Sequence, residues 1–162
     1  MIFFKGRHYC SPFPFPMFYI GKKVYCKTKK VKFDETIKYD IGVSQSSVNK
    51  LFGFGYGWHQ NQSDRIGFRY NIDYNKVEIV LYSYVLGNRI PTMHIAYLDI
   101  NKEYEINLTV NLKEGFRSVY CEVKNGYDIQ YIKKELRYEY KPIHYSLGGY
   151  FGGSYPAPHK IT

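Results

Sequence analysis

The chain has 162 residues, 44% of them hydrophobic and 19% aromatic, which suits one domain with a substantial core and excludes a disordered composition. Its net charge is +9, and most of the excess lies in residues 1–50, which hold ten Lys or Arg and three acidic residues. A basic amino-terminal third could face phosphates, an acidic protein or an anionic glycan. AT-rich codon usage, which raises the content of Lys, Tyr, Ile, Asn and Phe together, is the simpler explanation of this excess of basic residues.

The start of the chain shows no signal peptide, and no stretch reaches the roughly 18 apolar residues that a membrane span needs. We therefore expect cytoplasmic synthesis and no membrane partner. Cys10, Cys26 and Cys121 are odd in number and lack a C-x-x-C spacing, which predicts neither a disulfide framework nor a zinc site. Reduced cysteines indicate an intracellular setting during folding.

Residues 1–20 are predicted to form an extended segment rich in proline and phenylalanine, after a short strand at residues 2–5. Prolines at every second position remove amide donors, so the segment cannot be a central strand. Phe13, Phe15 and Phe18 are expected to hold it against the body of the protein. The same segment could instead be an arm that docks on a neighbouring subunit.

Residues 22–32 are rich in lysine and predict a basic edge strand, which discourages unwanted sheet pairing. Hydrophobic residues then fall on odd positions from Val31 to Ile41. This alternation predicts either a half-buried pair of strands or one strand that bends near Asp34 and Glu35.

The stretch 50–70 carries the strongest local pattern of the chain. A ring stands at every second residue and a glycine between each pair: Phe52, Gly53, Phe54, Gly55, Tyr56, Gly57 and Trp58. Because side chains on a strand point alternately to opposite faces, one face should be a row of four rings and the other bare backbone. The bare face needs a close neighbour, either another part of the chain or a ligand. After a polar turn, residues 66–72 alternate again and predict an antiparallel partner strand.

The remainder is expected to be a meander of hairpin-connected strands. Residues 76–86 are apolar on both faces and predict an interior strand, and residues 103–112 alternate most regularly. Further strands are predicted at 90–100, 116–123, 127–131 and 143–147, with a tight turn at Asn125-Gly126. Residues 129–140 fit either a strand or a single helical turn. The chain ends in a Gly/Tyr-rich loop within residues 148–162. These features predict one all-β domain over residues 1–162, an antiparallel β-sandwich.

The order F-G-Y-G-W, R-I-G-F-R-Y, K-V-E-I-V-L-Y-S-Y-V-L-G, Y-E-I-N-L-T-V and V-K-N-G resembles the core of concanavalin-like jelly rolls over residues 50–130. The ending Y-F-G-G-S-Y-P-A-P-H, with K-L-F-G-F at residue 50, resembles short uncharacterised proteins of Bacteroidetes and the phages that infect them. The second resemblance implies no activity, cofactor or catalytic residue. Jelly rolls of this type include lectins, glycan hydrolases, lyases and virion parts, so the fold alone decides no function.

Catalytic motifs are not evident. The E-x-D-x-E strand of retaining glycosidases is absent, and Glu103 and Glu105 on one alternating face are expected to be solvated. Alginate-lyase-like elements can be picked out at 135–137, 93–95 and 148–153, but in the wrong order, and we interpret them as chance. No phosphate loop, nucleotide fingerprint or metal-binding histidine spacing occurs. We therefore predict no catalytic residue, no metal and no cofactor.

A binding surface is a better candidate. Trp58, His59, Gln60, Arg65 and Arg69 cluster around one turn, and a ring with planar amide and guanidinium groups suits sugars and acidic glycans. The alternative is a polar hairpin tip with Trp58 as a core ring. Nucleic acid is not expected, because a high isoelectric point comes with no module signature.

Our leading hypothesis from the sequence is a non-enzymatic, surface-contact module in a phage virion or assembly, with a protein partner or a second copy. Its predicted contact residues are Phe13, Phe15, Phe18, Tyr150 and Tyr155. The alternative hypothesis is a lectin-like glycan-binding module, and a polysaccharide lyase is a remote third hypothesis.

Overall fold

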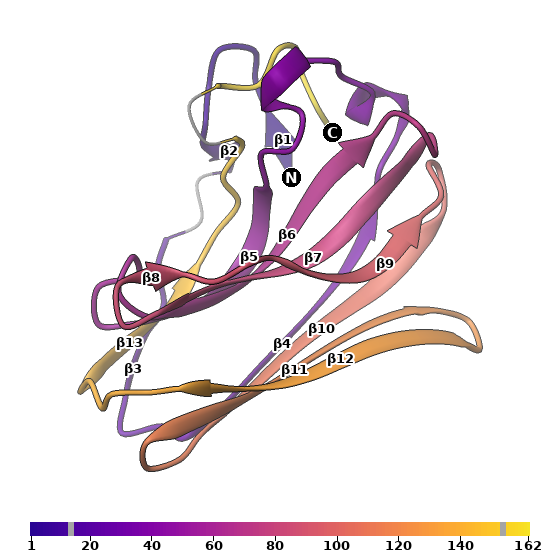
Figure 1. Cartoon of the computed structure of the whole chain (residues 1–162). Coiled ribbons are helices and arrows are strands. Elements are labelled where there is room, and N and C mark those ends of the chain that lie inside the picture. Colours follow the sequence, from indigo (N-terminus) through magenta and orange to yellow (C-terminus); the bar gives the residue numbers. More distant parts are fainter. Residues whose placement is uncertain (13–14, 153–154) are drawn as a thin grey trace.

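Two antiparallel β-sheets face each other in the structure, a computed structural model that describes residues 1–12, 15–152 and 155–162 (Figure 1). The smaller sheet has the order β12 (Asp128–Arg137), β11 (Phe116–Asn125), β10 (Glu103–Leu112), β4 (Val24–Lys32). The larger sheet has the order β3 (Phe18–Ile20), β13 (Ile143–Leu147), β5 (Asn49–Tyr56), β6 (Ser63–Asn71), β7 (Lys76–Val85), β8 (Asn88–Arg89), and β9 (Met93–Leu98) also pairs with β7. The prediction of an all-β antiparallel sandwich is confirmed.

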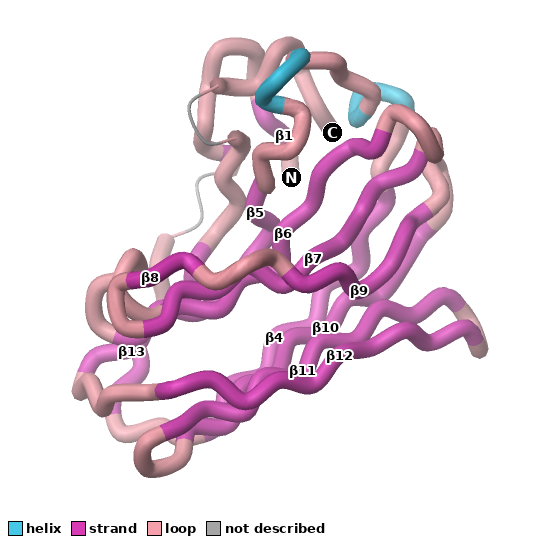
Figure 2. The backbone as a smooth tube through the Cα atoms, in the orientation of Figure 1, coloured by secondary structure: helices cyan, strands magenta, loops and turns pink. Residues whose placement is uncertain are grey.

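The remaining regular elements are short and lie near one end of the sandwich, as Figure 2 shows. They are β1 (Ile2–Phe3) paired with β2 (Cys10–Ser11), and two 3₁₀ turns at Glu35–Ile37 and Gly42–Ser44. Phe3 bridges to Ile161 through two backbone hydrogen bonds, so the described ends of the chain lie side by side. Among the described residues, no helix is long and apolar enough to cross a membrane.

The core lies between the sheets and follows the predicted alternation. Ile106, Leu108 and Val110 of β10 are fully buried, as are Ile66 of β6 and Ile79 of β7. Strand β7 is also largely buried on its outer side, through Val80 and Tyr82, and lies inside the sheet between β6 and β9, as predicted. Removal of these apolar faces from water is the main stabilisation of such a sandwich.

Strand β4 stands at the edge of the smaller sheet, which confirms the predicted basic edge strand. Its register with β10 turns Tyr25, Lys27 and Lys29 to the same side, toward the gap between the sheets. The ammonium groups of Lys27 and Lys29 lie 6.0 Å and 5.7 Å from the centre of the Phe52 ring. Long lysine stems therefore cover part of the core at this edge while the charges reach outward.

The predicted strand or strand pair at residues 31–41 is wrong beyond Lys32. The Asp34 side chain accepts a hydrogen bond of 2.9 Å from the Thr36 amide and caps a 3₁₀ turn, so the chain leaves the sheet there. Phe33, Ile37 and Tyr39 are nevertheless buried. The odd-position spacing reflects a packed loop, because a turn can also place alternate residues inward.

The ambiguous stretch 129–140 contains a strand: β12 runs from Asp128 to Arg137 and pairs with β11 along its whole length. The turn at Asn125-Gly126 joins these two strands, with a positive φ of 59° at Gly126. Positive φ is tolerated by glycine, which is why this dipeptide marks the hairpin.

Candidate functional site

A pocket of about 600 Å³ opens on the outer face of the larger sheet. Arg65 of β6 and Tyr82 and Tyr84 of β7 point to this outer face, because their neighbours Asp64 and Ser83 are buried inside the sandwich. The carboxy-terminal loop and the turn after β5 form the walls. The described lining residues are Tyr9, Pro16, Lys50, Trp58, His59, Gln60, Arg65, Tyr82, Tyr84, Tyr145, Ser146, Leu147, Gly148, Gly149, Tyr150 and Gly152. We call this site the tyrosine–cation pocket.

The glycines of β5 lie directly against two side chains that line the tyrosine–cation pocket. Gly53 pairs with Arg65 of β6, and Gly55 pairs with Tyr145 of β13. A Cβ atom at Gly53 would lie 2.8 Å from the Arg65 Cγ, and one at Gly55 would lie 2.9 Å from the Tyr145 Cζ. The bare face thus has a neighbour within the chain itself, since the Arg65 and Tyr145 side chains occupy that space.

Trp58 lies outside the core, so the predicted row of four inward rings contains three. Phe52, Phe54 and Tyr56 are buried, but the backbone turns at Gly57, whose φ is +68°, and Trp58 is 66% exposed. A positive φ ends the strand because the extended alternation stops there. The interpretation of Trp58 as a core ring is wrong, and the ring lines the pocket instead.

A hydrogen-bonded pair ties the turn after β5 to strand β13. The Tyr145 hydroxyl accepts a hydrogen bond of 3.1 Å from the His59 amide and lies 3.2 Å from the His59 Nδ1. Burial, followed by the positive charge of Arg65, lowers the pKa of His59 below its ordinary value. The ring is therefore mostly neutral at pH 7, and its Nδ1 can accept a hydrogen bond from the Tyr145 hydroxyl.

Two cations that face the pocket, Lys50 and Arg65, have no acidic partner among the described residues. The Lys50 ammonium lies 4.7 Å from the centre of the Tyr82 ring and 5.5 Å from that of Tyr150, and it is 3.4 Å from the Gly152 carbonyl. The Arg65 guanidinium donates from Nη2 to the Gly148 carbonyl at 2.9 Å, while its buried Nε has no hydrogen-bond partner within the described part of the chain. No Asp or Glu is among the described lining residues.

The burial of these cations changes their acidity. Burial, helped by the charges of Arg65 and Arg89, lowers the pKa of Lys50 to about 8. Burial also lowers the pKa of Arg65 to about 10. Both groups remain positively charged at neutral pH, although Lys50 loses its proton within the mildly alkaline range.

The wall formed by the carboxy-terminal loop is fixed to the sheet. Lys50 and Tyr150 exchange two backbone hydrogen bonds of 2.7 Å and 2.9 Å, and the Tyr150 ring stacks on His8 with centroids 5.1 Å apart. The Gly152 amide donates to the Asn49 side-chain oxygen. The loop after β13 therefore holds its tyrosine and its carbonyls at fixed places beside the two cations.

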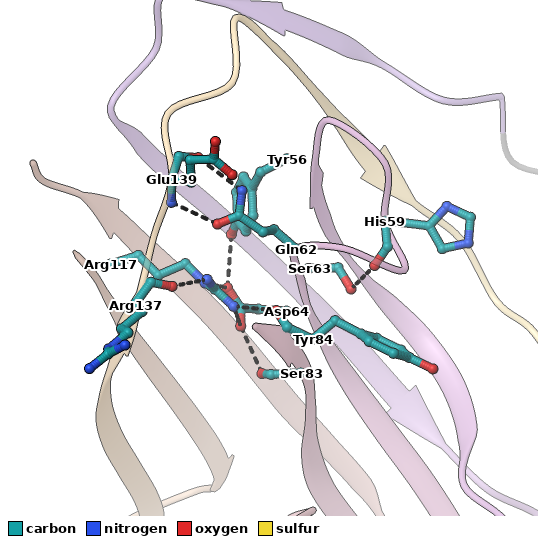
Figure 3. A network of polar contacts seen from close by, with 10 residues as sticks. All are labelled: Tyr56, His59, Gln62, Ser63, Asp64, Ser83, Tyr84, Arg117, Arg137 and Glu139. Carbon is teal, nitrogen blue, oxygen red and sulfur yellow. Dashed lines mark hydrogen bonds and ion pairs between the residues drawn. The ribbon is translucent and has the colours of Figure 1, made fainter. Parts of the chain in front are cut away.

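A buried ion pair lies behind the pocket and joins the two sheets (Figure 3). Arg117 of β11 donates to both carboxylate oxygens of Asp64, at 2.6 Å and 3.1 Å, and both side chains are fully buried. Asp64 also accepts from Tyr56 at 3.1 Å and from Ser83 at 2.7 Å. These bonds fix Asp64 inward and so fix its neighbour Arg65 outward.

The residues predicted at the site are divided by the structure. Trp58, His59, Gln60 and Arg65 line the pocket together. Arg69 lies outside it, since its Nε pairs with Glu78 at 2.5 Å and one Nη contacts the Ser46 carbonyl at 3.3 Å. Arg69 points to the same face as Arg65 but is four residues further along, roughly 13 Å at the usual rise per strand residue.

The predicted contact residues have different surroundings. Phe15 and Phe18 are 88% and 64% exposed, and Tyr155 is 52% exposed. Tyr150 is half-buried and belongs to the pocket. Phe13 lies outside the described residues.

Sequence reasoning missed Lys50, Tyr82 and Tyr84, and it assigned Tyr145 only to a strand. The signal was present in the alternation of β7, where tyrosines at 82 and 84 share a face with the glycines of the adjoining strands. The three lyase-like segments do not meet in the pocket. Of the three segments, only the one that begins at Gly148 contributes residues to the described lining of the pocket.

Neither a known protein family nor a curated protein matches the chain. Within the described part of the chain, no three His, Cys, Asp or Glu side chains lie close enough to hold a metal ion. What the chain binds is therefore inferred from the chemistry of the tyrosine–cation pocket.

Proposed function

We propose that this protein is a non-enzymatic, lectin-like module that binds glycans in the tyrosine–cation pocket. The supporting observation is that Trp58, Tyr84, Tyr145 and Tyr150 line one pocket together with polar side chains. Sugar rings present apolar C–H faces that pack against aromatic rings, and their hydroxyl groups need fixed donors and acceptors. A concanavalin-like jelly roll, a fold that includes lectins, is part of the same proposal.

The geometry of the pocket suits a ligand of limited size. A volume of about 600 Å³ falls within the range of small-molecule sites and can hold one or two sugar rings. The Gly148 and Gly152 carbonyls and the His59–Tyr145 pair are fixed by hydrogen bonds, so they are oriented before a ligand arrives. Groups that are already ordered cost less entropy on binding.

Glycan-array screening followed by titration calorimetry tests this function. Trp58→Ala should weaken binding about tenfold, because the ring is exposed and supplies stacking area that the fold does not need. Tyr127→Ala is the matched control, since Tyr127 is also exposed but lies at the β11–β12 turn. Absence of binding to any glycan, or equal binding by the wild type and Trp58→Ala, would reject the proposal.

A second candidate is the assembly role predicted from the sequence, in which the chain contacts a second copy or a virion protein. It is favoured by the apolar exposure at β3, where Met17, Phe18 and Ile20 are 62%, 64% and 84% exposed beside an edge with no described strand partner. Light scattering at high concentration is the test. Phe18→Ser should dissociate such an assembly, and a wild-type protein that stays monomeric would exclude self-assembly.

A further inference from the structure

The charges in the tyrosine–cation pocket restrict the kind of glycan that fits. Arg65 and Tyr82 are directly paired across β6 and β7, and the Lys50 ammonium lies 4.7 Å from the centre of the same Tyr82 ring. The two cations therefore flank one aromatic side chain on one face of the sheet. The two charges are also close enough to interact, since the Arg65 charge is among the causes of the lowered pKa of Lys50.

The same protein shows how a buried cation is satisfied when its role is structural. Arg117 is fully buried and donates to both oxygens of Asp64, and it also reaches the Arg137 and Tyr84 carbonyls at 2.7 Å and 2.8 Å. Arg65 is the next residue to Asp64 but has one described hydrogen bond, from Nη2. Burying a charge is costly unless it is paired, so two unpaired cations in a concave site indicate an anion supplied from outside.

The partners that the cations do have stabilise them only in part. Lys50 has one long contact of 3.4 Å with the Gly152 carbonyl and lies near the Tyr82 and Tyr150 rings. Ring faces attract a cation but leave its hydrogen-bond donors unused. An acceptor group placed between the two cations would use the ammonium donors of Lys50 and the Nη donors of Arg65 that the Gly148 carbonyl leaves unused.

We infer that the ligand of the tyrosine–cation pocket is an acidic saccharide, with its anionic group held between Lys50 and Arg65 and its ring packed on the aromatic walls. This inference rests on the proposed glycan-binding function. The recognised chemistry is an anion attached to a sugar ring, either a carboxylate of a uronic acid or a sulfate ester. A planar guanidinium pairs with either group through two parallel hydrogen bonds.

Calorimetric titration with matched oligosaccharides tests this inference on the full chain. The probes are a uronic-acid oligosaccharide, its carboxyl-reduced neutral counterpart and a sulfated oligosaccharide of the same length. We expect at least one acidic probe to bind about tenfold or more tightly than the neutral counterpart, with an affinity that falls as salt is added. The preferred acidic probe then identifies the carboxylate or the sulfate as the natural group.

Lys50→Met and Arg65→Gln should each abolish the preference for acidic probes. Lys133→Met, on the exposed side of β12, is the matched control and should retain it. Methionine preserves the length of the lysine stem, and circular dichroism with thermal unfolding confirms that each variant folds. Arg65→Lys keeps the charge and should keep part of the preference even if Arg65→Gln is unstable.

The outcomes separate the inference from the function on which it rests. Equal binding of neutral and acidic probes would overturn the inference and leave glycan binding in place. Binding of no saccharide would reject both. Tighter binding of a short single-stranded oligonucleotide than of any acidic saccharide would also overturn the inference, because the cations would then serve phosphates.

Discussion

Replacing Arg117 with methionine tests whether the buried ion pair holds the two sheets together behind the pocket. Methionine fills much of the same volume but removes the three donors that contact Asp64 and the carbonyls of β7 and β12. The Asp64 carboxylate would then be fully buried with hydroxyl donors from Tyr56 and Ser83 alone. We expect a large loss of stability.

The expected size follows from leaving one buried charge unpaired. Removing one partner of such a pair costs about 3–5 kcal/mol of the free energy of unfolding. For a domain of 162 residues, this corresponds to a fall of roughly 10 °C in the melting temperature.

Urea unfolding of the single variants and of the double variant Asp64→Leu/Arg117→Met provides the measurement. If the pair acts as a unit, the double variant is more stable than the sum of the single effects predicts, by about 2 kcal/mol or more. A loss below about 1 kcal/mol in Arg117→Met, or additive effects in the double variant, would show that this reasoning about the buried pair is wrong.

Four further predictions concern the pocket and the core. Gly53→Ala should destabilise the fold by at least 1–3 kcal/mol in urea unfolding, because the new Cβ would lie 2.2 Å from a backbone oxygen of β6. Gly55→Ala should instead mainly weaken ligand binding, since its Cβ would lie 2.9 Å from the Tyr145 ring and push the ring out of its bound position beside His59; unchanged affinity in calorimetry would contradict this. Affinity for an acidic probe should be nearly constant up to about pH 7 and then fall, approaching a tenfold loss per pH unit above about pH 9, as Lys50 with its pKa of about 8 loses its proton; Lys50→Met should remove this dependence. Burial lowers the pKa of His144, so the unfolded state binds the proton more tightly and the free energy of unfolding should fall as the pH drops below about 6.5; a flat profile from pH 7.5 to 5 would refute this.

Strands with strict alternation were predictable from the sequence. Residues 103–112 and 143–147 form strands with the predicted bounds, and residues 76–86 form one that is a residue shorter. A period of two is a direct consequence of strand geometry, so one buried face leaves a clear pattern. The same rule failed at residues 31–41, because a capped turn at Asp34 also places alternate residues inward.

The site was predictable only around the turn after β5. Trp58, His59, Gln60 and Arg65 are close in sequence, and the glycines between the rings indicated a face that something must cover. The rest of the pocket comes from strands that are far apart in the sequence: Lys50 from β5, Tyr82 from β7, and Tyr145 with the loop at 148–152 from β13 and the segment after it. These residues meet only because of the order of the strands in the sheet. Local patterns carry no information on which strands become neighbours, which is why Arg69 was included and Tyr82 was missed.

The inward-facing lysines of β4 have a consequence for aggregation. A foreign strand that hydrogen-bonded to the free edge of β4 would enclose the Lys27 and Lys29 ammonium groups, which now reach water past the Phe52 ring. Burial already lowers the pKa of Lys27, so further enclosure would be opposed. Fibril growth by strand addition should therefore be disfavoured on this side of the smaller sheet.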